Sequence, residues 1–197
     1  PCRSAHRFSH DPSNSFGTLG FRPTRQLPRI LAGFNLIGTN GEGFLEYLHA
    51  ETGIPFVLLP GGTFDMGSPG TEANRSADEG PVHPVTLDPF LIAKYEVTQA
   101  QYASVTAGHA TLSATPSRNF GTTVGGSQRP VEQVSWDDLH AADGFLERTG
   151  LSLPSEARWE YAARARTNTA FSFGDDCNAF TCAPCGPTDD FMWSCNN

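Results

Sequence analysis

Turn-forming residues interrupt this sequence so often that only short helices and strands can form between them. The chain holds 20 glycines and 15 prolines among 197 residues, and breaks recur at residues 60–62, 88–89 and 150–154. Because glycine and proline both disfavour the interior of regular elements, a long helical bundle is excluded. A hydrophobic content of 38%, with 14 Phe and 3 Trp, still allows a packed core. We predict an α+β fold with short strands, two or three helices and long loops.

The charge of the chain excludes two classes of partner. Its formal net charge is -8 and its 13 Lys and Arg residues are scattered, whereas binding to nucleic acid or to an anionic membrane requires clustered positive charge. No apolar run approaches the roughly 18 residues of a membrane span. We therefore expect neither nucleic acid nor a membrane as partner.

The first half of the chain carries strand-like patterns separated by turn signals. Residues 54–59 are apolar and end at a Pro-Gly-Gly turn, and residues 63–66 alternate apolar and polar side chains, so we predict that these segments form a hairpin. Residues 82–97 contain two further strand-like runs. The polar stretch 67–81 is expected to be an exposed loop. Residues 24–49 show no sustained periodicity and are interpreted as a linker that packs partly on its neighbours.

Three helices are predicted in the second half, each from a recognisable start. Thr98 and Gln101 have the spacing of a capping box. A second helix is expected from Ser135 to a left-handed stop at Gly150, and a third from Ser155. The residues expected to face the core are Trp136, Leu139, Ala142, Phe145 and Leu146 on the second helix and Trp159, Ala162 and Ala163 on the third.

Polar residues on these elements are interpreted as structural. Arg158 stands where a capping box of the third helix would have Glu. Glu160 and Arg164 are four residues apart on that helix, so we expect a surface ion pair. His83 and His140 are each interpreted as hydrogen-bonded structural histidines rather than catalytic bases.

Four sequence motifs, in this order, resemble the formylglycine-generating enzyme family, also called sulfatase-modifying factor domains. They are PGGTFDMGS at 60–68, DEGPVHPVTLDPFLIAKYEVTQAQY at 78–102, RPVEQVSWDD at 129–138, and LPSEARWEYAARA with FSFGDD within 153–176. Their joint order and spacing are highly specific. The resemblance, which covers residues 54–176, implies an incomplete domain of the C-type lectin-like fold.

The first residues resemble the opposite end of the same family. The stretches CRSAHR and LGFRP, within residues 1–23, are similar to the family's last strands. In a tandem protein, residues 1–23 would finish an upstream copy, residues 24–49 would link, and residues 50–197 would be the truncated N-terminal part of a second copy. In a circularly permuted protein, residues 1–23 would instead pair with the strand at 56–64 of the same domain.

The resemblance implies two classes of function for the parent protein. Family enzymes hold copper through two cysteine thiolates, which suit Cu(I), activate O2, and oxidise a cysteine in a sulfatase peptide to formylglycine. That pair would lie upstream of residue 1, so no residue here is expected to be catalytic, and Cys2 is interpreted as a small buried strand residue. The alternative is a non-catalytic, C-type lectin-like module that binds a protein or glycan partner.

A cysteine-rich stretch near the end of the chain offers candidate metal ligands. Four thiolates could form a tetrahedral zinc site, but two disulfides or free structural thiols fit the spacing better. Neighbouring oxygen ligands suit calcium, which family enzymes hold after the third helix, or form a solvated acidic loop. The cysteines are Cys177, Cys182, Cys185 and Cys195, and the oxygen ligands are Asp175, Asp176 and Asn178.

The expected truncation has a consequence for the surface. A chain that lacks the segments covering its core exposes apolar side chains. We therefore expect Trp136, Phe145 and Trp159 to lose packing partners and to be exposed.

Overall fold

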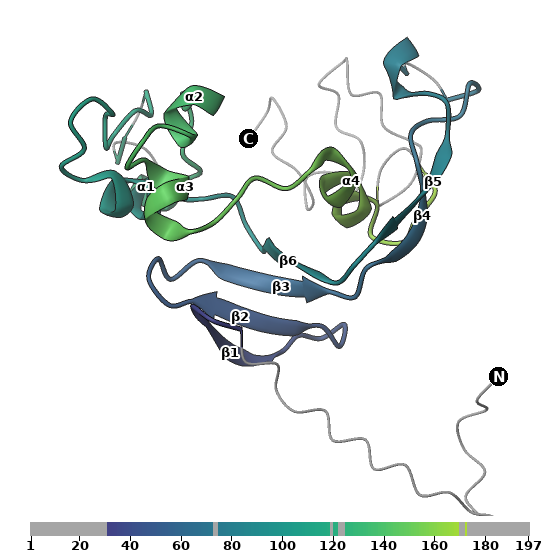
Figure 1. The fold of residues 1–197 in the computed structure, drawn as a ribbon, viewed down its shortest axis with the longest axis horizontal. Helices are drawn as coiled ribbons and strands as arrows, with labels where there is room; N and C mark the ends of the chain where they lie inside the picture. The colour runs from purple at the N-terminus through teal and green to yellow at the C-terminus, as the bar shows by residue number, and fades with distance from the viewer. Residues whose placement is uncertain (1–30, 73–74, 119, 122–124, 170–171, 173–197) are drawn as a thin grey trace, which may run out of the picture.

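The computed structural model describes residues 31–72, 75–118, 120–121, 125–169 and 172. In this part the fold is α+β, as predicted, with two antiparallel sheets and four α-helices (Figure 1). A four-stranded sheet has the order β1-β2-β3-β6, and a two-stranded sheet pairs β4 with β5. The strands are β1 Phe34–Thr39, β2 Leu45–His49, β3 Pro55–Leu59, β4 Gly62–Met66, β5 His83–Leu87 and β6 Phe90–Ala93. The helices are α1 Gln99–Thr106, α2 Trp136–Leu139, α3 Phe145–Thr149 and α4 Glu156–Arg164, with 3-10 turns at Ala77–Glu79 and Gly126–Gln128.

Two strands occupy the stretch interpreted as a linker. β1 and β2 pair with each other, and β2 pairs with β3, so residues 34–49 extend the sheet formed by the following strands. The turn between β1 and β2 is closed by Asn40, whose side-chain oxygen accepts from the backbone N–H groups of Glu42 and Phe44. Tyr47 and His49 on β2 are buried, at 0% and 5% exposed. Alternation along β2 therefore makes a strand of a segment that lacks a long apolar run.

The hairpin predicted from residues 54–59 and 63–66 is wrong, because these strands belong to different sheets. β3 lies between β2 and β6, and β4 pairs with β5. Gly61 turns the chain from one sheet to the other at φ 70°. A side chain at this position would collide with the backbone carbonyl of Leu87, so the two chain segments approach closely only because glycine is present. Both edges of β3 are occupied, one by β2 and the other by β6.

The single helix predicted from Ser135 to Gly150 is also wrong, because it is divided into α2 and α3. Asp143 lies between them with φ 59°, in the left-handed region. Gly144 follows, and a side chain there would approach the carbonyl oxygen of Ala141 to 2.7 Å. One consequence is that Trp136 points away from the core and is 64% exposed.

The predicted helix ends are confirmed. Thr98 and Gln101 form the capping box of α1, with each side chain bonded to the other residue's backbone N–H. Ser155 caps α4 through a bond from the N–H of Arg158, without a capping box. Gly150 ends α3 with φ 65°. These features depend on residues within four positions, which is why the sequence alone identifies them.

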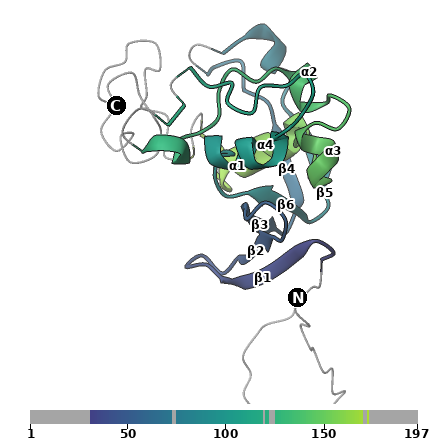
Figure 2. The same ribbon diagram turned by 90° about the vertical axis from the view of Figure 1, so that its left-hand side faces the viewer.

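The core lies where the helices meet the four-stranded sheet. Its buried cluster comprises Ile54, Phe56, Tyr102 and Phe145, and the rings of Tyr102 and Phe145 stack with centroids 5.6 Å apart. Phe56 contacts Phe34 edge-on at 5.2 Å, which joins β1 to this core. In both views the four α-helices lie beyond β6, at the opposite end of the four-stranded sheet from β1 (Figures 1 and 2). Within the described residues, no helix is both long and apolar enough to span a bilayer.

Candidate functional site

An apolar hollow of about 680 Å³ lies beside β6. In Figure 1, α1 to α3 stand at one end of β6 and α4 stands at the other. The floor comes from β3, β6 and the residues that follow β6, and the walls come from both helix groups. The lining residues that carry the argument are Phe56, Phe90, Tyr95, Phe145, Arg158 and Trp159.

The α4 wall presents an exposed aromatic side chain to the hollow. Trp159 lines the hollow and remains 62% exposed, so the prediction that it faces the core is wrong. Beside it, the guanidinium group of Arg158 lies over the ring of Phe90, 5.5 Å from the centroid. An aromatic face next to a positive charge at the edge of an apolar surface is typical of a binding surface.

A partly buried ion pair on α4 attaches this helix to the residue that follows β4. Arg164 and Glu160 are 2.7 Å apart, as predicted, but their side chains are only 17% and 19% exposed. Glu160 accepts from the N–H of Gly67 at 2.8 Å, and Arg164 donates to the carbonyl oxygen of Gly67 at 2.7 Å. Tyr161 adds a bond from its hydroxyl to the carbonyl oxygen of Gly61 at 2.6 Å. The helix is thereby bonded to both ends of β4.

The opposite wall, formed by α1 to α3, contains aromatic core residues that are buried. Phe145 is 3% exposed, so the expectation that it loses its partners is wrong, while the same expectation is confirmed for Trp136 and Trp159. Burial raises the pKa of Tyr102, and the nearby charge of Asp138 contributes in the same direction. Tyr102 therefore stays a neutral packing residue at physiological pH.

Arg148 connects this wall to α1. Its guanidinium group donates to the carbonyl oxygens of Val105 and Ala107 and to the carboxylate of Asp143. The hydrogen bond from Arg148 lowers the pKa of Asp143 below its ordinary value. Arg148 thereby supplies hydrogen bonds to carbonyl groups at the C-terminal end of α1.

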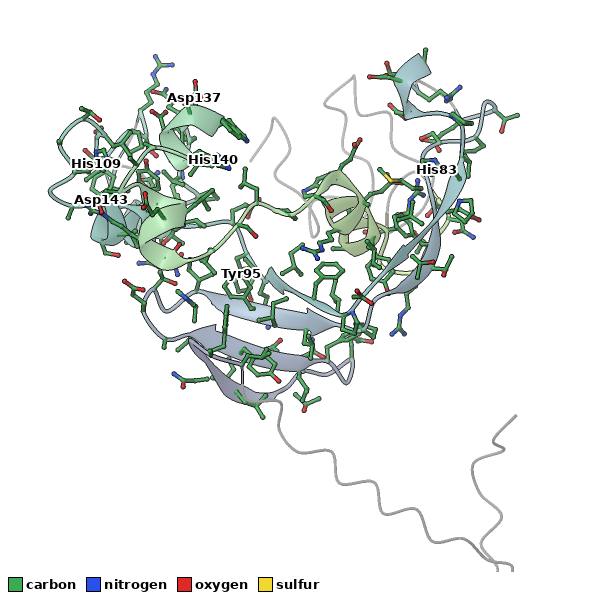
Figure 3. The ribbon with its side chains drawn as sticks, viewed as in Figure 1. His83, Tyr95, His109, Asp137, His140 and Asp143 are labelled. Carbon is green, nitrogen blue, oxygen red and sulfur yellow. The ribbon has the colours of Figure 1, made fainter. Side chains whose placement is uncertain are left out.

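The rim beside β6 is polar and charged. Lys94 donates to Glu46 on β2 at 2.8 Å, and this bond raises the pKa of Lys94. Tyr95, the next residue, is 63% exposed and lies between the two helix groups (Figure 3). Of the lining residues in the described part, only Lys94, Glu96 and Arg158 are charged at neutral pH. The hollow can therefore bind apolar or aromatic groups.

His83 and His140 are each hydrogen-bonded to a nearby backbone carbonyl, as predicted. His83 bonds the carbonyl oxygen of Pro81, and His140 bonds that of Trp136 and stacks on its ring at 3.8 Å. His109 bonds the carbonyl oxygen of Ala142. Figure 3 places His109 and His140 in the α1 to α3 group and His83 on β5, far from them.

The metal-ligand candidates lie outside the described residues. This applies to Cys177, Cys182, Cys185 and Cys195, and to Asp175, Asp176 and Asn178. Cys2 lies outside them as well. Among the residues that the structure does describe, no group of three or more His, Cys, Asp or Glu side chains is placed to hold a metal ion. The described part therefore contains no thiolate that could bind copper.

Sequence reasoning missed the hollow because its lining comes from distant segments. Residues 54–56, 90–97, 131–139 and 145–159 meet only after the sheet and helices have packed. The exposed Tyr95 and the bonds from Glu160 and Arg164 to Gly67 carry no signal at short sequence separation. The available signal was the expected exposure of Trp159, which lines the hollow.

Comparisons with known proteins agree with the motifs. Formylglycine-generating enzymes from Thermomonospora curvata and Streptomyces coelicolor are 30% identical over 154 residues and 28% identical over 183 residues. These matches cover 58% and 71% of this chain, and 50% and 54% of the two enzymes. The solved structure of PvdO from Pseudomonas aeruginosa has 29% sequence identity and a TM-score of 0.48, and the match covers 61% of this chain and 51% of PvdO.

The chain spans about half the length of the curated relatives it matches. A family model for the sulfatase-modifying factor enzyme 1-like domain matches residues 47–190, which include part of β2, the strands β3 to β6 and all four α-helices. The chain therefore belongs to the family of formylglycine-generating, sulfatase-modifying factor domains.

Proposed function

We propose that the protein containing this chain oxidises a cysteine of a sulfatase-type peptide to formylglycine. The observation that carries the proposal is the family match over residues 47–190, together with two relatives that are named formylglycine-generating enzymes. The substrate Cβ–S bond is cleaved and a C=O bond forms, with release of hydrogen sulfide. O2 takes up four electrons and ends as water and the aldehyde oxygen; two electrons come from the substrate and two from a thiol reductant.

In this proposal residues 31–169 are the scaffold and not the redox centre. Copper would need soft thiolate ligands, and the described residues contain no cysteine. No step of the reaction is therefore assigned to a described side chain. What these residues supply is a rigid wall, in which α4 is bonded to β4 through Glu160, Arg164 and Tyr161.

The test is a conversion assay on the full-length natural protein. The protein is incubated with Cu(I), O2, a thiol and a synthetic peptide that contains a sulfatase cysteine, and the peptide is analysed by mass spectrometry and aldehyde labelling. We expect an aldehyde product that disappears when a Cu(I) chelator is added or O2 is removed. Unchanged peptide from a folded, copper-supplemented protein would contradict the proposal.

A non-catalytic binding module is the second candidate, and the exposed rim of the hollow favours it. Tyr95 and Trp159 are 63% and 62% exposed beside an apolar surface, as is common where a protein or glycan partner binds. If the conversion assay fails, binding to a glycan array by the wild type, with loss of signal in Trp159→Ala, would support this role. Absence of binding in both proteins would exclude it for glycans.

A further inference from the structure

A positive charge without an ionic partner stands at one end of the apolar hollow. The charged side chains of the described lining are those of Lys94, Glu96 and Arg158. Lys94 is bonded to Glu46 at 2.8 Å, so its charge is already balanced. Within the described residues, the side chain of Arg158 forms no ion pair and no hydrogen bond. Its guanidinium carbon lies over the ring of Phe90, 5.5 Å from the centroid.

The charge of Arg158 does not stabilise its own helix. Arg158 is the third residue of α4, where Glu or Gln would complete a capping box and where a cation opposes the helix dipole. Thr98 with Gln101 and Ser135 with Asp138 form such boxes on α1 and α2. Arg158 therefore costs α4 a cap, and among the described residues its charge gains only the ring contact.

The opposite end of the hollow carries a negative charge. Glu96 lies two residues before Thr98, the N-cap of α1, and α1 and α4 stand at opposite ends of β6 (Figure 1). Glu96 is exposed, so water and salt screen its charge. An anionic group is therefore directed to the α4 end, and an apolar body attached to it would extend along β6 toward Tyr95, which lies between the two helix groups (Figure 3).

We propose that the hollow binds a small apolar carboxylate, that is, one molecule with an apolar or aromatic body and a single carboxylate group. The planar guanidinium group of Arg158 matches the two oxygens of a carboxylate. The body would lie against Phe90, Tyr95 and Trp159, and a volume of about 680 Å³ suits one small molecule. Because α4 is bonded to Gly67, the cation is held in position before the ligand binds.

The test is an NMR titration of the full-length natural protein, in which amide chemical shifts give the Kd of each compound. Octanoate carries both parts of the proposed ligand, octanol only the apolar body, and acetate only the carboxylate. We expect octanoate to bind at least about fivefold more tightly than octanol, and acetate to cause no shifts at the same concentration. Equal affinities for octanoate and octanol, or no binding of octanoate, would overturn the proposal.

Substitution of Arg158 tests which residue holds the carboxylate. Arg158→Gln should weaken octanoate binding at least about fivefold and leave octanol binding unchanged. This variant should stay folded, because Gln at the third position of α4 can complete the capping box with Ser155. Arg118→Gln removes the same charge from an exposed site outside the hollow and should change neither affinity. An equal loss in the two variants would show that net charge attracts the anion and would contradict the proposal.

The C-terminus of another protein is a second source of an apolar carboxylate, and the same titration distinguishes it. A short apolar peptide with a free C-terminal carboxylate that bound at least about tenfold more tightly than octanoate would assign the hollow to a protein tail and contradict the proposal. The titration needs no copper, O2 or sulfatase peptide, so its outcome is independent of the oxidase assay.

Discussion

Gly67 is bonded through both of its backbone groups to one ion pair, which makes this contact a sensitive point at the scale of single residues. Arg164→Ala removes the bond to the carbonyl oxygen of Gly67 and leaves Glu160 without its cation. Because both charged side chains are less than one fifth exposed, we expect a loss of about 2 kcal/mol in the free energy of unfolding. Urea denaturation measures this change.

The matched control is Arg118→Ala. Arg118 is exposed, and its backbone, not its side chain, bonds Glu132. The expected change is within about 0.5 kcal/mol. Equal effects of the two substitutions would show that the Gly67 contact does not stabilise the fold.

The N-terminal cap of α2 makes a second prediction at this scale, which concerns pH. Hydrogen bonds from the side chain and backbone of Ser135 lower the pKa of Asp138 from its ordinary value of 3.8. The ionised carboxylate therefore stabilises the folded chain above this value, and the contribution is lost as the pH falls through the lowered pKa. Ser135→Ala should raise the pKa of Asp138 toward 3.8, as measured by carboxyl NMR titration.

Asp143 provides the control in the same titration. Its pKa is lowered mainly by Arg148 and should not respond to a change at Ser135. A pKa of Asp138 that is unchanged in Ser135→Ala would contradict the assigned cause.

At the scale of elements, the corner between β3 and β4 decides which strands pair. Gly61 and Gly53 both have positive φ, at 70° and 66°, but only Gly61 faces the backbone of a neighbouring strand. Gly53→Ala should cost about 1 kcal/mol of unfolding free energy for the left-handed conformation alone. Gly61→Ala should cost at least about 3 kcal/mol, because the methyl group also meets the Leu87 carbonyl.

Thermal or urea unfolding of the two variants gives this comparison. Similar losses for Gly53→Ala and Gly61→Ala would mean that the corner can relax, and that close approach of the two segments is not what directs β4 away from β3.

The sequence predicted correctly those features of the helices that depend on local contacts. The caps at Thr98 and Ser155 and the stop at Gly150 depend on neighbours within four residues, and all three are confirmed. The predicted hairpin of β3 and β4 was wrong because strand partners are set by contacts between segments distant in sequence. The predicted long second helix was wrong because Asp143 adopts the left-handed conformation, which a helical sequence pattern does not reveal. The candidate metal ligands lie outside the described residues and stay predictions.

At the scale of the whole molecule, the hollow should bind apolar molecules through α4. Trp136 and Trp159 are similarly exposed, at 64% and 62%, but only Trp159 lines the hollow. We expect Trp159→Ala to reduce the fluorescence of a bound hydrophobic dye at least about twofold, because apolar ligands gain free energy from buried aromatic area. Trp136→Ala should leave the dye signal unchanged.

Both side chains are exposed, so neither substitution should change the unfolding free energy by much more than about 0.5 kcal/mol. An equal fall in dye fluorescence for both variants would show that the dye binds elsewhere or that it reports general loosening. A wild-type chain that binds no dye would show that the hollow is filled.

The two walls of the hollow are anchored to different parts of the fold. α4 is bonded to β4 through Gly67 and Gly61, whereas α3 is bonded to α1 through Arg148. The walls are connected directly along the chain by residues 150–155, between Gly150 and the cap at Ser155. Because this segment is short, its backbone dihedral angles set the distance between the two walls. Substitutions that stiffen it would fix the width of the hollow without altering either wall.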